Sequence, residues 1–128
     1  MANNPHPPSV LVVDDELLIR WALCEALGAK GYNVSEARDA AEVRTALSRS
    51  NGFPDIVLLD FRLPDSSDLR LLADIRCRLP AVPVVLMTAH ATPDIVSGAL
   101  DLGAYRVLTK PFDVREMVTL VAEALDQT

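Results

Sequence analysis

The chain has 128 residues, half of them hydrophobic and 23% charged, as expected for one globular domain with a core of its own. Its 12 basic and 18 acidic residues give a formal charge of -6, so we predict no direct contact with nucleic acid, which requires a basic surface. No apolar run approaches the ~20 residues of a membrane helix, and we predict no membrane association.

Local composition gives the expected domain limits and compartment. Residues 1–9 hold three prolines but neither the basic start nor the apolar centre of a signal peptide, and we expect a disordered tail there. The folded domain is then expected to cover residues 10–126. Cys24 and Cys77 lack metal-ligand spacing, so we expect reduced thiols in a cytoplasmic protein.

Short apolar runs alternate with helical patterns along the chain. In chain order, the predicted elements are strand 10–13, helix 17–30, strand 32–36, helix 39–49, strand 56–60, helix 67–79, strand 82–87, helix 92–102, strand 105–109 and helix 113–125. Capping boxes begin at Asp39 and Asp113, and Thr92 is followed by a first-turn proline. Gly31 and Gly103 follow helices as stop signals.

Alternating strands and helices predict an α/β fold with a parallel sheet and helices on both faces. Right-handed crossovers limit the topology to a doubly wound sheet, and for five strands we predict the flavodoxin-like order 2-1-3-4-5. In that order the first strand lies beside the third. Asp14 and Asp15, which follow the first strand, should therefore face Asp60 at the end of the third.

Three carboxylates at one site repel one another unless a cation joins them. Their oxygens are hard ligands without a Cys or His partner, which favours Mg²⁺, with Mn²⁺ or Ca²⁺ as substitutes. The alternative is that Asp14 and Asp15 form a solvated helix start, where the helix dipole favours acids.

Thr88 and Lys110 follow the fourth and fifth strands, so they should reach the same rim as the acids. Either residue alone would be an ordinary loop or surface residue. Together they offer a hydroxyl and a cation to an oxyanion, above all a phosphoryl group. Asp60 is the best candidate nucleophile because it is central and carboxylates form aspartyl-phosphates.

These motifs resemble the receiver domain of bacterial two-component response regulators, from about Val10 to Leu125. The matching residues are Asp14-Asp15, Asp60 with Leu63-Pro64, Thr88-Ala89 and Lys110-Pro111-Phe112. The sequence that flanks these motifs is most similar to receivers of the nitrogen-regulator class of transcriptional activators. Such proteins carry further domains after the receiver, and the sequence leaves open whether this domain acts alone.

The resemblance implies a role for each site residue. Asp60 would be phosphorylated, and Thr88 and Lys110 would bind the phosphoryl oxygens. Asp15, Asp60 and the Arg62 backbone carbonyl would hold Mg²⁺ directly, with Asp14 acting through water. The Lys110-Pro111 bond would be cis.

The resemblance also implies a signalling function. The phosphoryl donor would be a phosphohistidine on a sensor histidine kinase, and the only reactions would be self-phosphorylation and autodephosphorylation, without turnover of a free substrate. The helix over 92–102, the fifth strand and the last helix would form the output face, a candidate homodimer contact.

The sequence departs from the family pattern at three places. Asp68 replaces a common glycine, so the loop before the third helix is expected to differ in shape. Val107 replaces the usual aromatic switch residue, and Tyr105 is expected on the same strand face. Arg62 and His90 occupy variable positions that resemble those governing phosphoryl lifetime; the alternatives are that Arg62 pairs with Asp65 and that His90 is a solvated loop residue.

Functions of other classes remain open at this stage. An aspartyl-phosphate hydrolase would usually carry its nucleophile and a second Asp two residues later, after the first strand, which Asp14-Asp15-Glu16 does not match. A flavin carrier would need a phosphate loop where these acids stand. A receiver that binds partners without phosphorylation is the third alternative.

Overall fold

The computed structural model describes residues 7–48 and 52–126, and it shows five strands alternating with five helices in that part of the chain. The elements are β1 (Ser9–Val13), α1 (Leu17–Ala29), β2 (Asn33–Ala37), α2 (Ala40–Ser48), β3 (Ile56–Asp60), α3 (Arg70–Arg78), β4 (Val84–Thr88), α4 (Pro93–Asp101), β5 (Arg106–Thr109) and α5 (Val114–Asp126). No helix among the described residues is long and apolar enough to cross a membrane. Most of the predicted tail lies outside the described residues, and β1 begins at Ser9.

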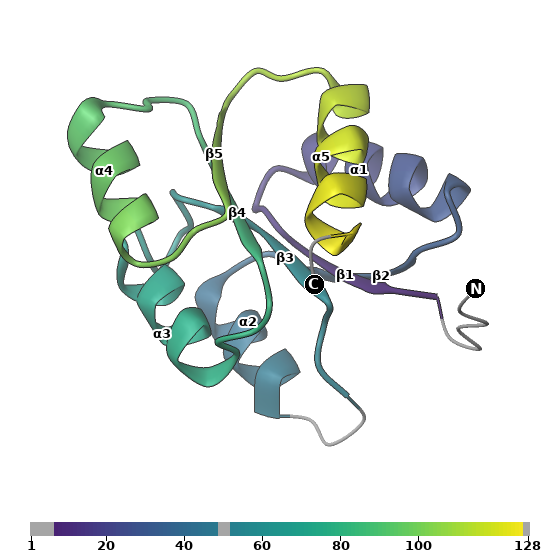
Figure 1. Cartoon of the computed structure of the whole chain (residues 1–128), viewed down its shortest axis with the longest axis horizontal. Coiled ribbons are helices and arrows are strands. Elements are labelled where there is room, and N and C mark those ends of the chain that lie inside the picture. Colours follow the sequence, from purple (N-terminus) through teal and green to yellow (C-terminus); the bar gives the residue numbers. More distant parts are fainter. Residues whose placement is uncertain (1–6, 49–51, 127–128) are drawn as a thin grey trace.

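The strands form one parallel sheet in the order β2-β1-β3-β4-β5, which confirms the predicted topology. The register pairs Val10 with Ile56 and Val13 with Leu59, so β1 and β3 end level with each other. Helices α1 and α5 cover one face of the sheet, and α2, α3 and α4 cover the other (Figure 1). The carboxyl ends of β1 and β3 therefore meet at one edge.

Alternation along each strand divides the core into two clusters. In β1, Val10 and Val12 pack with α1 and α5, while Leu11 and Val13 pack towards α2 and α3. Every residue of β3 and β4 is buried, as expected for central strands covered on both faces. These two strands hold Asp60 and Thr88 in rigid positions at their carboxyl ends.

The entry to α3 differs from the prediction, because this helix begins at Arg70 rather than at residue 67. Asp68 accepts a hydrogen bond from Arg70 N at 2.9 Å, which fixes a bend before the helix. Positive φ angles occur only at glycines among the described residues. Asp68 therefore replaces the family's usual glycine without entering the left-handed region.

The predicted residues cap these helix starts, with two changes in their hydrogen bonds. Thr92 Oγ1 accepts a hydrogen bond from Ile95 N at 3.3 Å, and Asp39 Oδ1 accepts one from Glu42 N at 2.8 Å. The expected return contact from Glu42 goes instead to Arg38 N, at 2.8 Å. Asp113 caps Arg115 N at 2.8 Å rather than the third residue of its box.

Tyr105 does not share the face of Val107, contrary to the prediction. It lies just before β5, outside the regular alternation, and packs against the cluster on the α1 and α5 side. Val107 packs against the opposite cluster. The Arg106 guanidinium lies 5.5 Å from the centre of the Tyr105 ring, which favours this position of the ring. Tyr105 therefore cannot substitute directly for an aromatic residue at position 107.

We expect Gly103→Ala to destabilise the protein by about 2 kcal/mol, because it combines two costs. Gly103 has a φ of +95°, and a Cβ there would lie 2.8 Å from Arg76 Nε. Urea denaturation would measure the loss. Gly28→Ala is the matched control, since a Cβ at this helical position meets nothing within 4 Å. It should stabilise the protein by about 0.5–1 kcal/mol. Equal stability of the two variants would contradict this expectation.

Candidate functional site

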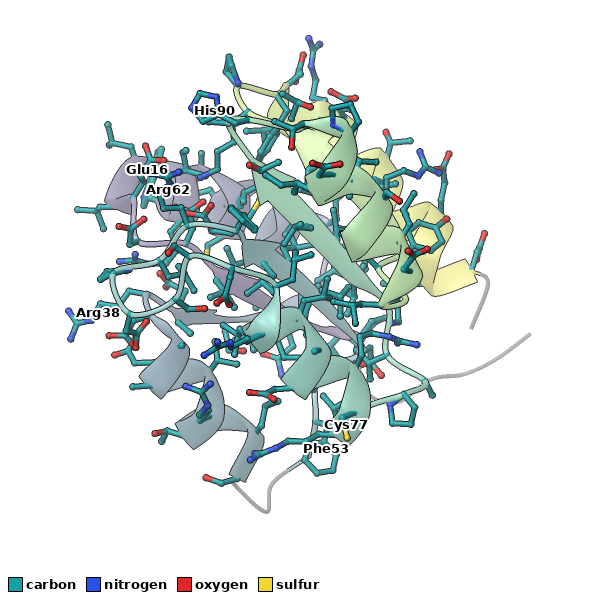
Figure 2. All side chains as sticks on the ribbon, turned by 90° about the vertical axis from the view of Figure 1, so that its left-hand side faces the viewer. Glu16, Arg38, Phe53, Arg62, Cys77 and His90 are labelled. Carbon is teal, nitrogen blue, oxygen red and sulfur yellow. The ribbon has the colours of Figure 1, made fainter. Side chains whose placement is uncertain are left out.

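One cleft of about 350 Å³ is lined by the predicted residues Asp15, Asp60, Thr88 and Lys110, and the buried Asp14 clusters with Asp15 and Asp60. It lies beyond the carboxyl ends of the parallel strands, where α/β sheets bind ligands. Glu16, Arg62 and His90 lie at this edge of the molecule, and Phe53 and Cys77 lie at the opposite edge (Figure 2). The cleft is lined by Asp15, Glu16, Asp60, Phe61, Arg62, Thr88, Ala89, His90, Ile95 and Lys110.

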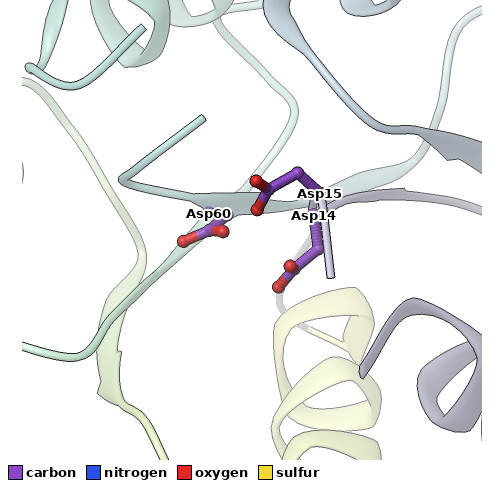
Figure 3. A group of neighbouring side chains, drawn as sticks. All are labelled: Asp14, Asp15 and Asp60. Carbon is purple, nitrogen blue, oxygen red and sulfur yellow. The ribbon is translucent and has the colours of Figure 1, made fainter. Parts of the chain in front are cut away.

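The three predicted acids form a cluster in which one carboxylate oxygen of each lies within 4.8 Å of the others. The Asp15 side chain points towards Asp60 (Figure 3). Asp14 is fully buried and Asp60 is 5% exposed, whereas Asp15 is open to solvent. Two acids are thus fixed and largely desolvated, and the third can be reached from outside.

Lys110 supplies the countercharge to this cluster. Its Nζ lies 2.8 Å from Asp14 Oδ2 and 3.2 Å from Asp60 Oδ2, and its side chain is 10% exposed. A third contact, 3.2 Å to Glu16 Oε1, reaches the exposed rim. Because both Asp14 and Asp60 are buried, this network is far less screened by water than a surface ion pair.

The pKa values of Asp60 and Lys110 are both raised, which makes the carboxyl group harder to ionise and keeps the ammonium charged. Burial, followed by the charge of Asp14, raises the pKa of Asp60 to about 6, although Lys110 and the Arg62 amide oppose the rise. Burial alone would lower the pKa of Lys110. The hydrogen bond and charge of Asp14, with the charge of Asp60, more than offset this and raise that pKa above its ordinary value. Lys110 is therefore cationic at neutral pH.

The donor set fits a hard divalent cation. Asp14 Oδ2 is buried, and the Lys110 ammonium 2.8 Å away is the ion-pair partner that the structure gives it. Asp60 Oδ1 accepts a hydrogen bond from Arg62 N at 3.3 Å, which places the Arg62 peptide beside the carboxylates. Asp14, Asp15, Asp60 and the Arg62 carbonyl could thus hold a metal through oxygen atoms and waters. An ion would also neutralise the repulsion that Lys110 balances only in part.

Thr88 and Lys110 are held together by the backbone. Lys110 N donates to the Thr88 carbonyl at 2.8 Å, and His90 N donates to Thr88 Oγ1 at 3.1 Å. The Lys110-Pro111 peptide is cis, as predicted. Thr88 and Lys110 therefore line the same cleft as Asp15 and Asp60, at the ends of two adjacent strands.

The structure brings the predicted site residues together and adds two contacts that were not predicted, one by Glu16 inside the cleft and one by Asp65 outside it. Glu16 contacts Lys110 and was visible as the third acid in Asp14-Asp15-Glu16. Asp65 was considered only as a partner for Arg62. Its carboxylate instead accepts hydrogen bonds from the first amides of α2, a contact that no local sequence pattern signals.

The chain is similar in sequence to response regulators of the nitrogen-regulator class. It is 42% identical over 116 residues to the DNA-binding transcriptional regulator NtrC of Escherichia coli strain K12, covering 91% of this chain and 24% of that protein. The response regulator protein PilR of Pseudomonas aeruginosa is 42% identical over 115 residues, covering 90% of this chain and 25% of PilR. The chain thus spans about a quarter of the length of these relatives.

Solved structures and a family model agree with this likeness. The receiver domain of NtrX from Brucella abortus superposes with a TM-score of 0.83 at 31% identity, covering 93% of this chain and 99% of that one. A CheY-like receiver domain protein from Methanospirillum hungatei gives a TM-score of 0.88 at 27% identity, covering 94% and 95%. The family model for the response regulator receiver domain matches residues 10–122. With its fold, its acid cluster and nearly its whole length accounted for, the chain belongs to the response regulator receiver domain family.

Proposed function

We propose that this domain is a phospho-accepting switch that receives a phosphoryl group on Asp60. The observation that carries the proposal is the position of Asp60. It is a 5% exposed carboxylate at the end of β3, 3.2 Å from the Lys110 ammonium and clustered with Asp14 and Asp15 in an open cleft. A buried carboxylate surrounded by metal-type ligands and a fixed cation suits attack on phosphorus.

The donor is a phosphohistidine of a sensor histidine kinase in the cytoplasm. An Asp60 carboxylate oxygen forms a bond to phosphorus, the P–N bond to the donor imidazole breaks, and that nitrogen keeps the electron pair and takes up a proton. Thr88 and Lys110 bind the phosphoryl oxygens and balance their charge. Water reverses the modification by releasing inorganic phosphate from Asp60, so the domain acts only on itself and does not turn over a free substrate.

Mg²⁺ is the cation that the donor set favours, and when bound it would neutralise negative charge on the carboxylates and the phosphoryl oxygens. Asp15, Asp60 and the Arg62 carbonyl would hold it directly, and Asp14 would act through water. With the carboxylate charge neutralised in this way, the Lys110 ammonium would be available to bind the phosphoryl oxygens.

The output surface is the face formed by α4, β5 and α5. Thr88 ends β4, and Lys110 follows β5, so both strand ends that contact the phosphoryl group lead into this face. Ala99 is the only fully buried residue of α4, which leaves this helix weakly held and able to shift. Leu100 on this helix and Leu102 at its C-cap are 49% and 38% exposed and offer an apolar contact for a second copy in a homodimer.

Intact-mass measurement after incubation with Mg²⁺ and acetyl phosphate tests the proposal. We expect one added phosphoryl group on the wild type and none on Asp60→Asn, which keeps the shape of the site but removes the nucleophilic carboxylate. Omitting Mg²⁺ should also prevent the addition. Size-exclusion chromatography of the modified protein would then test the homodimer.

Each other outcome identifies an alternative. No adduct on a wild type that binds Mg²⁺ would favour a receiver that binds partners without phosphorylation. An adduct that persists in Asp60→Asn would place the nucleophile elsewhere and overturn the proposal. Steady release of phosphate from small phosphate esters would indicate a hydrolase instead.

A further inference from the structure

The start of α2 receives two carboxylates, one local and one distant. Asp39 is the local cap, and its Oδ1 accepts from Glu42 N at 2.8 Å. The Asp65 oxygens accept from Ala40 N at 2.8 Å and from Ala41 N at 3.1 Å. These amides would otherwise lack partners within the helix. The hydrogen bond from Ala40, the larger cause, lowers the pKa of Asp65, so the cap is anionic at neutral pH.

Asp65 belongs to the β3–α3 loop, which also borders the acid cluster. Leu63 and Ser66 exchange backbone hydrogen bonds of 2.7 and 3.2 Å, which closes a tight turn with Asp65 inside it. Leu63 is 4% exposed and is anchored in the core. On the other side, Arg62 N donates to Asp60 Oδ1. Arg62 therefore lies between the end of β3 and the Leu63–Ser66 turn. Asp65, in this turn, connects it to α2 through two hydrogen bonds.

We infer that Asp65 is a positioning residue for the metal site, because its carboxylate fastens the β3–α3 loop to the start of α2 and so holds the Arg62 carbonyl beside Asp60. The inference rests on the proposed function, in which that carbonyl is a metal ligand. Without Asp65, the turn keeps only its own two hydrogen bonds and the Leu63 anchor. The Arg62 peptide then has to be ordered when the metal binds, and the affinity falls by that cost.

Asp65→Ala in the full chain, titrated with Mg²⁺ alone and followed by backbone amide NMR shifts, tests the inference. We expect the dissociation constant for Mg²⁺ to rise about tenfold, at the lower end of effects seen when groups that orient metal ligands are removed. Asp65→Asn keeps an amide oxygen for one of the two helix amides and should lose less. In the metal-free protein, the Leu63 amide should exchange with solvent faster in Asp65→Ala than in the wild type.

Asp39→Ala is the matched control, because it removes a cap from the same helix but lies outside the β3–α3 loop. It should lower the melting temperature, as Asp65→Ala does, while leaving the Mg²⁺ affinity unchanged. Equal affinity in wild type and Asp65→Ala would overturn the inference and leave the proposed function intact. Should Asp65→Ala fail to fold, an Asp65→Asn protein with wild-type affinity and Leu63 exchange would overturn it. A wild type that binds no Mg²⁺ would overturn both.

Discussion

Replacing Lys110 by methionine is expected to destabilise the metal-free protein by about 3 kcal/mol at neutral pH, because it leaves two buried carboxylates without their countercharge. Lys110 Nζ lies 2.8 Å from Asp14 and 3.2 Å from Asp60, and the exposed fractions of these three side chains are 10%, 0% and 6%. Methionine keeps most of the length of the side chain, so the loss reports charge rather than an empty space. Urea denaturation measures it.

Two conditions should restore the stability of Lys110→Met. At about pH 5, below the raised pKa of Asp60, this carboxyl group takes up a proton, which removes its repulsion with Asp14. An excess of Mg²⁺ supplies a cation in place of the ammonium, so the metal should stabilise the variant more than the wild type. Lys30→Met is the control, because Lys30 is exposed at the end of α1 and its loss should change stability by less than about 0.5 kcal/mol. A Lys110 variant as stable as the Lys30 variant would show that the buried network contributes little.

The sheet topology could be predicted from the sequence because each central strand is a continuous apolar run bounded by turn residues. Residues 56–59 form an unbroken apolar run that indicates a strand buried on both faces, and the structure buries all of them. The start of α3 could not be predicted, because its first apolar position, Leu69, fits either a helix or a bend. The hydrogen bond from Arg70 N to Asp68 decides in favour of the bend.

The positions of the site residues could also be predicted, but the individual contacts between their side chains could not. Parallel strands bring their carboxyl ends to one edge, so the meeting of Asp14, Asp60 and Thr88 follows from topology alone. The contacts of Lys110 with Asp14, Glu16 and Asp60 depend on distances of about an ångström, which spacing in a sequence does not contain. The Asp65 cap joins segments 24 and 25 residues apart, and only their packing brings them together.

Asp60→Asn is expected to stabilise the metal-free protein by about 2–3 kcal/mol at neutral pH while it abolishes phosphorylation. The pKa of Asp60 is raised from 3.8 to about 6, so folding favours the neutral acid over the carboxylate when the folded and unfolded chains are compared. Ionisation of Asp60 therefore opposes folding, and asparagine resembles the neutral acid without being able to ionise. A site that destabilises its own fold is a common feature of residues kept for reactivity rather than for stability.

The sign of this effect gives it a pH window. A carboxyl group whose pKa is raised on folding contributes stability below its unfolded value, near 3.8, and loses this contribution as the pH rises through about 6. The stability gap between Asp60→Asn and the wild type should therefore be small at about pH 4 and reach its full size above about pH 7. Excess Mg²⁺ should narrow the gap at neutral pH, because it stabilises the wild-type carboxylate and binds the variant less well. Thermal unfolding across this range measures the gap. A gap independent of pH would mean that Asp60 is ionised as easily as in the unfolded chain, and the cluster would then owe its arrangement to Lys110 alone, without a strained carboxylate for a metal or a phosphoryl group to relieve.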